Sequence, residues 1–241
     1  MTVRRFGCLL GFATLIFAQS ALAAQAMDPD NPTCPLNPGW SVNREMRLSI
    51  QSVGGKQVLL AEGVIDDNLL PRLEAALQDQ SIQEIRLRSP GGDARIGYAA
   101  GAMIRRSLLP THIPAGWACA GSCAFMFMGG IERSIAPGGL YIVQMFSVVG
   151  DREAVARQID QGGDRAIDLM NEIARQSARV ATEDNAYLIR MGVSRSLLTD
   201  IVYRQQATPT ATDRSSRRCL TPEELRRYNV MNVMGPSPSR P

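Results

Sequence analysis

The chain has 241 residues, of which 45% are hydrophobic and 20% are charged, and its formal net charge is +3. This length suits one α/β domain with a sizeable core. The weak net charge argues against a nucleic acid or another polyanion as the main ligand.

Residues 1–26 have the pattern of a secretory signal peptide. Two arginines precede the apolar run 6–18, which is too short to cross a membrane, and cleavage can follow Ala23 or Ala26. An uncleaved anchor is the alternative. We therefore expect a periplasmic or secreted protein that is not an integral membrane protein after cleavage.

Strand and helix signals alternate after an irregular lead over residues 27–46. A glycine pair at Gly54-Gly55 predicts a turn between the first two strands. We expect strands at 47–52, 58–63, 82–87, 111–114 and 141–146, and helices at 68–78, 96–104 and 124–128. This alternation predicts parallel crossover units.

The second half of the chain is mostly helical and rich in arginine. A helix is expected over 152–191 with a break at Gly162-Gly163, and Ser194 is expected to cap a further short helix. Thr221-Pro222-Glu223-Glu224 predicts the start of a last helix, because it combines a capping residue, proline and early acids. We predict a polar loop at 208–216, a disordered tail at 235–241 and a domain spanning 47–234.

Four cysteines remain after the predicted cleavage, and an even count in an exported protein favours disulfides. Three pairings are open, of which we favour Cys34 with Cys219 and Cys119 with Cys123. The second pair sits near the upper end of disulfide reach, and the alternative is two free thiols packed as small apolar groups. With one histidine in the chain, His112, the sequence predicts no metal site, and we predict no cofactor.

Two glycine-bearing turns lie about thirty residues apart, each between a strand and a helix. The first is Ser89-Pro90-Gly91-Gly92 and the second is Cys119-Ala120-Gly121-Ser122-Cys123. Such turns can aim backbone N–H groups at one point, which is how an oxyanion hole is built. We therefore expect Gly91, Gly92, Gly121 and Ser122 to form a binding site for a carbonyl group or an anion. The alternative is that the glycines only shape the turns.

Residues 84–146 resemble the Clp protease proteolytic subunit and its exported bacterial relatives, within the wider ClpP/crotonase superfamily. The residues that carry the resemblance are the two turns, Gly129-Gly130, Arg133 and Pro137-Gly138-Gly139. The resemblance extends well over roughly 45–150 and loosely over 190–233. It implies an α/β single domain built as a spiral of ββα units. Because relatives form rings or smaller assemblies, it also allows a homo-oligomer.

The resemblance places the serine, histidine and acid of the family triad at Gly121, Gln144 and Arg217. None of these residues can perform the corresponding step, because glycine has no nucleophile, glutamine is no base near neutral pH and arginine carries the wrong charge. The sequence therefore predicts no catalytic residue. We expect a catalytically inactive, exported protein that keeps the groove of a peptidase and binds a peptide or a protein partner.

The main alternative is an active serine hydrolase that uses Ser122 with an unidentified base, for which His112 and Lys56 are weak candidates. We expect Ser122 instead to cap the helix that follows, and His112 to be an edge or surface residue. Asp213 is a substitute for the missing acid only if its loop shifts, and Cys123 is a weak candidate nucleophile. A crotonase-like acyl-binding enzyme is disfavoured by the predicted export.

Overall fold

The computed structural model describes residues 26–28, 31–145, 156–157, 159–160, 162–205 and 217–233. Residues 1–25 of the predicted signal peptide, the polar loop at 208–216 and the C-terminal tail lie outside these residues. So do the end of the strand predicted at 141–146 and parts of the first ten residues of the helix predicted at 152–191.

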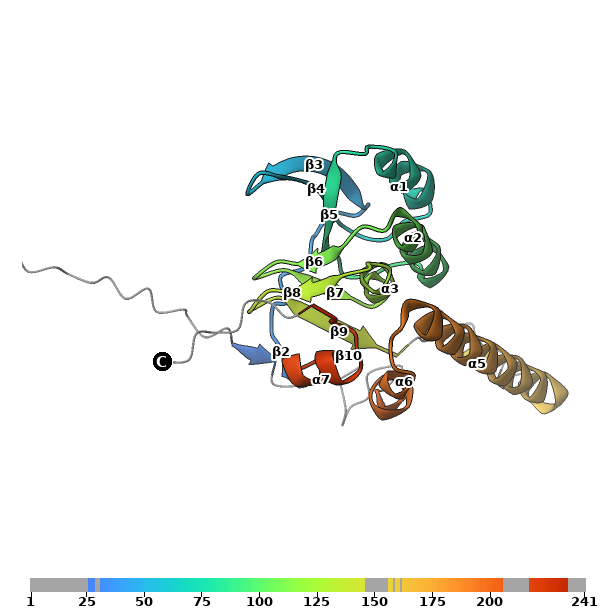
Figure 1. The fold of residues 1–241 in the computed structure, drawn as a ribbon. Coiled ribbons are helices and arrows are strands. Elements are labelled where there is room, and N and C mark those ends of the chain that lie inside the picture. Colours follow the sequence, from blue (N-terminus) through green and yellow to red (C-terminus); the bar gives the residue numbers. More distant parts are fainter. Residues whose placement is uncertain are drawn as a thin grey trace, which may run out of the picture.

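The larger sheet has five strands in the order β3-β4-β5-β6-β8. The first two strands form an antiparallel hairpin, and β4, β5, β6 and β8 run parallel. Helices α1, α2 and α3 lie along one side of this sheet, where their apolar side chains join one core with the strands (Figure 1). The bounds are β3 Arg47–Val53, β4 Lys56–Glu62, α1 Leu69–Leu77, β5 Ile82–Arg88, α2 Ala94–Ser107, β6 Thr111–Ile113, α3 Cys123–Met128 and β8 Arg133–Ile135.

A smaller sheet has the order β10-β9-β7, with β7 Ala118–Ala120, β9 Leu140–Gln144 and β10 Arg217–Cys219. Strands β7 and β9 are parallel, and β10 is antiparallel to β9. Along the chain, β6 and β8 of the large sheet are each followed by a strand of the small sheet, and α3 follows β7. These strand–strand–helix units confirm the expected α/β single domain.

Several short strands were not predicted. Strands β7, β8 and β10 have three residues each, which is too short to show an alternating apolar pattern. The lead that was predicted to be irregular contains β1 Met27–Asp28 and β2 Asn31–Pro35, which pair antiparallel. Strands β7, β8 and β10 depend on pairing with other segments, which a local pattern does not report, whereas β1 and β2 pair with each other.

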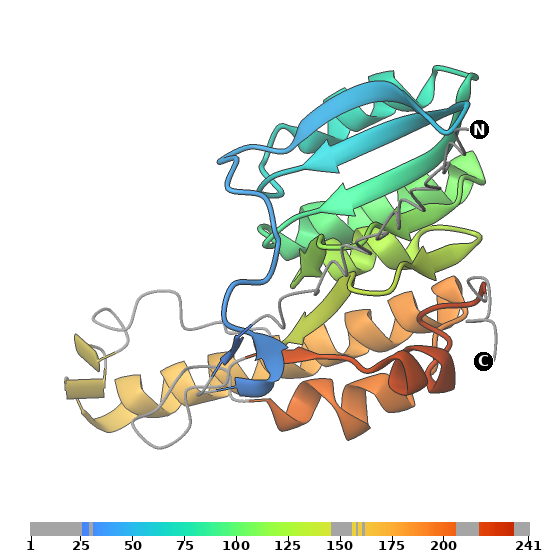
Figure 2. The ribbon, with the colours of Figure 1, turned by 90° about the vertical axis from the view of Figure 1, so that its left-hand side faces the viewer.

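The C-terminal region is helical, as expected, with α5 Gly163–Met191, α6 Ser196–Asp200, the 3₁₀ turn η1 Val202–Arg204 and α7 Pro222–Arg227. The first half of α5 extends away from the sheets (Figures 1 and 2). Ser194 is not the N-cap of α6, because the helix starts after Arg195, although the Ser194 Oγ accepts a hydrogen bond from the Ser196 N–H. Among the described residues, no helix combines the length and apolar character needed to span a membrane.

Arg133 fastens the C-terminal segment to the sheet. Its side chain is 1% exposed, and its guanidinium donates to the carbonyl oxygens of Val230, Asn229, Gly130 and Met191 at 2.8 to 3.3 Å. Burial, helped by the neighbouring charge of Arg105, lowers the pKa of Arg133 to about 10. The cation therefore stabilises the ends of several elements through carbonyl groups alone.

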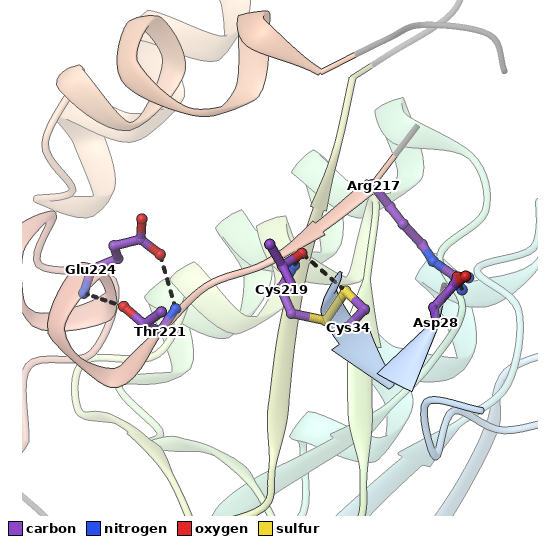
Figure 3. The surroundings of a disulfide bond; sticks show 7 residues. Asp28, Cys34, Arg217, Cys219, Thr221 and Glu224 are labelled. Atoms are coloured by element: carbon purple, nitrogen blue, oxygen red, sulfur yellow. Dashed lines mark hydrogen bonds and ion pairs between the residues drawn. A yellow bond between two sulfur atoms is a disulfide. The ribbon is translucent and has the colours of Figure 1, made fainter. Parts of the chain in front are cut away.

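Both favoured cysteine pairings are present. Cys34 and Cys219 form a disulfide with a Cα–Cα distance of 5.2 Å that joins β2 to β10 (Figure 3), and Cys119 and Cys123 form one with a Cα–Cα distance of 5.3 Å at the start of α3. Figure 3 also shows the capping box of α7, in which Thr221 and Glu224 bond reciprocally.

The two disulfides should differ in their contribution to stability. The first closes a loop of 185 residues and the second a loop of 4. On loop-closure entropy, replacing Cys34 and Cys219 by alanine should lower the free energy of unfolding by about 5 kcal/mol, against about 2 kcal/mol for Cys119 and Cys123. Urea denaturation followed by circular dichroism measures both values. Equal losses would contradict the loop-length account.

Candidate functional site

The two glycine-bearing turns lie side by side. Ser89 forms a parallel bridge with Cys119, with hydrogen bonds from the Ser89 N–H to the Ala118 carbonyl and from the Ala120 N–H to the Ser89 carbonyl, both at 2.9 Å. On its other side, the first turn forms a parallel bridge between Gly92 and Ile65. The Gly91-Gly92 segment is therefore held between two other backbones.

Only glycine fits at this crossing. Gly91 has φ of +102°, and a Cβ placed there would lie 2.9 Å from the Ala120 carbonyl oxygen and 3.3 Å from the Ser122 nitrogen. Gly121 has φ of +55°, but a Cβ there would meet its first neighbour, the Pro90 carbonyl oxygen, only at 3.7 Å. Glycine is thus required at position 91 both because another backbone lies too close for a Cβ and because φ is positive. At position 121 only the positive φ requires it.

Two backbone donors remain open at this crossing. The N–H groups of Gly92 and Ser122 donate to no acceptor among the described residues, whereas the Gly91 N–H donates to the Ser89 Oγ. Gly92 is exposed, and both residues line one cavity of about 680 Å³. Gly92 and Ser122 are therefore the donors that such a site could use, whereas Gly91 is not, and the binding site for a carbonyl or an anion stays a prediction.

The Ser122 side chain does not point to where a displaced nucleophile would act. It is 6% exposed, its Oγ has no hydrogen-bond partner, and it packs against α2, where a Cβ on Gly97 would lie 2.9 Å from the Ser122 Cβ. Ser122 is the N-cap residue of α3, as predicted, but its side chain makes no capping hydrogen bond. Ser122 therefore lines the cavity, but its hydroxyl is buried and has no hydrogen-bond partner.

The three residues that the resemblance assigns to the triad positions do not come together in one site. Gly121 and Gln144 line the same cavity. Arg217 lies opposite Gln144 in the β9–β10 pair, but its side chain forms an ion pair with Asp28 at 3.2 Å (Figure 3). Its guanidinium also lies over the Trp40 ring. Arg217 thus anchors the N-terminal lead rather than the cavity.

The candidate bases lie elsewhere. His112 is on β6, an inner strand and not an edge, and its Nδ1 is 2.8 Å from the Ser134 Oγ. Burial lowers the pKa of His112. Lys56 is exposed in the β3–β4 hairpin. Neither lines the cavity, the thiol of Cys123 is used in a disulfide, and Asp213 lies outside the described residues.

A cluster on α2, α5 and η1 was missed by sequence analysis. The buried Asp184 carboxylate accepts hydrogen bonds from the hydroxyls of Tyr98 and, at 3.4 Å, Tyr203, and all three residues line the cavity. The signal was available in α5, because Asp184 shares a helical face with the buried Tyr187, Leu188 and Met191.

Tyr98, Tyr203 and the Asp184 carboxylate shift one another's pKa values. Burial raises the pKa of Asp184, although the hydroxyls of Tyr98 and Tyr203 oppose this rise. Burial and the Asp184 charge raise the pKa of Tyr203 to about 12 and that of Tyr98 still further. Both phenols are therefore donors at neutral pH.

The end of β9 offers an open main-chain edge to the cavity. The Leu220 N–H donates to the Tyr141 carbonyl, and the Gly121 N–H donates to the Ile142 carbonyl. Because backbone groups alternate sides along a strand, those of Gln144 face the same side as those of Ile142. Strand β7 ends at Ala120, opposite Ile142, so no described strand pairs with Gln144 on that side.

The described fold is similar to that of two solved proteases. One is a ClpP1 mutant from Listeria monocytogenes, which is 18% identical to this chain. The alignment covers 72% of this chain and 88% of the ClpP1 chain, with a TM-score of 0.44. The other is a mutant of the 1510-N membrane-bound stomatin-specific protease, at 16% identity, 75% and 78% coverage and a TM-score of 0.43. No protein-family profile and no curated protein matches the sequence. Likenesses at this level carry no inference about activity or residue roles.

The two glycines of the crossing should respond differently to alanine. Gly121→Ala should lower the free energy of unfolding by about 1 kcal/mol, because only the positive φ is strained. Gly91→Ala should cost at least about 2 kcal/mol, because the new Cβ also meets backbone atoms. Thermal and urea denaturation measure both losses. An equal loss at the two positions would show that the backbones are not in close contact.

Proposed function

We propose that this chain is an exported, Clp-peptidase-like protein that binds an extended peptide segment and has no serine-peptidase chemistry. The observation that carries the proposal is the contrast within one cavity. Open main-chain groups of Gly92, Ser122 and Gln144 are retained, while Gly121 and Gln144 stand where a nucleophile and a base would be needed.

Peptide binding by strand addition fits these groups. An extended peptide is bound chiefly through main-chain hydrogen bonds, and a strand edge that faces a cavity supplies them without any particular side chain. The edge at Gln144 and the Gly92 N–H both line the cavity, so a segment lying over Gly121 is within the same enclosure. Self-association into a homo-oligomer stays a prediction.

Export is supported indirectly. The Cys34–Cys219 and Cys119–Cys123 disulfides suit an oxidising compartment, and the N-terminal pattern predicts a signal peptide. A periplasmic or secreted location is therefore part of the proposal.

Absence of serine chemistry is tested with a fluorophosphonate probe. The purified exported protein and its Ser122→Ala variant should both stay unlabelled, because the buried Ser122 hydroxyl has no base beside it. A known serine hydrolase, labelled in parallel, serves as the control. Labelling of the wild type that disappears in Ser122→Ala would establish an active serine hydrolase instead.

Strand addition is tested on the Gln144 backbone. Fluorescein-labelled hexapeptides with randomised central residues should bind the wild type, as measured by anisotropy. Gln144→Pro should weaken binding about tenfold or more, because proline removes the N–H at the unpaired end of β9 while the pairing of β9 with β10 is left in place. Gln144→Ala is the matched control and should bind like the wild type. A loss in both variants would place the contact in the glutamine side chain.

A further inference from the structure

Among the charged side chains that line the cavity, all except Asp184 form an ion pair with another lining residue. Asp93 pairs with Arg95 at 3.8 Å, and Glu183 pairs with Arg179 at 3.7 Å. Asp184 forms no ion pair with any described residue. The lining therefore carries one carboxylate without a counter-charge, and that carboxylate is the most deeply buried charged group of the set.

The environment of Asp184 is that of a receptor for a positive charge. The residue is 6% exposed, and a buried charge is costly unless it is paired. The hydroxyls of Tyr98 and Tyr203 each occupy one acceptor position, and a carboxylate has about four, so further donors can be accepted. The charge of a bound cation would stabilise the ionised carboxylate that burial disfavours.

Further groups of the same cavity suit a cation on an apolar stem. Tyr98 and Phe125, stacked at 4.0 Å between ring centroids, line the wall, and aromatic rings attract cations. A guanidinium has five donors, and two of them can pair with the two oxygens of one carboxylate.

We propose that the cavity binds an arginine side chain of the peptide that pairs with Gln144, with Asp184 as the counter-charge. This assignment rests on the proposed peptide binding and defines its specificity. Because Asp184 and Gln144 line one cavity, the long arginine stem connects the main-chain groove to the carboxylate on α5.

The test compares an alanine-based hexapeptide carrying one central arginine with the same peptide carrying citrulline, a neutral isostere. Anisotropy titrations use the full-length chain, exported and purified. The arginine peptide should bind the wild type about tenfold more tightly, and the ratio should fall to about one in Asp184→Asn. Asp200→Asn is the matched control: Asp200 also accepts from a tyrosine hydroxyl, that of Tyr228, but does not line the cavity, so the tenfold ratio should remain.

The outcomes separate this proposal from the proposed function. If both peptides bind equally to the wild type, or if Asp184→Asn keeps the ratio, arginine recognition is overturned while peptide binding stands. If neither peptide binds, butylguanidinium and its neutral analogue butylurea decide the matter in thermal denaturation. A rise in Tm with butylguanidinium alone, lost in Asp184→Asn, supports the cation site without a peptide groove. No such rise overturns it.

Discussion

The site depends on the contact between backbones at the Gly91-Gly92 turn. There the chain passes between Ile65 and the segment 120–122, with no room for a side chain. This contact joins the two sheets and sets where α3 begins. It also orients the N–H groups of Gly92 and Ser122, because neither has freedom to turn once the three backbones are packed. The geometry of the cavity is therefore determined by main-chain packing and not by the residues that would perform catalysis.

Under the proposed function, this separation lets a peptidase-like frame lack peptidase chemistry. Nucleophile, base and acid are side-chain functions, so a change of side chain at Gly121 or Gln144 leaves the main-chain pairing of the strands in place. Main-chain donors and acceptors persist through such substitutions, since every residue except proline supplies both. In the proposed function, a groove that recognises peptides through its backbone outlasts the reaction, and the role we propose for Asp184 is to select among those peptides.

The sequence predicted those features that depend on local pattern or on residue chemistry. The amphipathic helix α1, the capping box at Thr221 and both cysteine pairings are of this kind. It did not predict the three-residue strands β7, β8 and β10, which exist only through pairing with other segments. It also missed the Asp184 cluster, because Tyr98 and Asp184 are 86 residues apart and meet only after α5 packs on α2. For Ser122, the sequence predicted only that the side chain would not point as a nucleophile does. Its actual orientation is fixed by packing against Gly97, which is a tertiary contact that a sequence pattern does not report.

The two disulfides impose an order on the oxidation of the growing chain. Synthesis delivers Cys34 early and its partner Cys219 near the end, so Cys34 is available for wrong pairing while most of the chain emerges. Cys119 and Cys123 appear together, and their separation of 4 residues gives them a far higher local concentration for each other than for Cys34. The short bridge therefore closes first and withdraws both competing thiols. Its contribution is to the fidelity of assembly as much as to the stability of the finished protein.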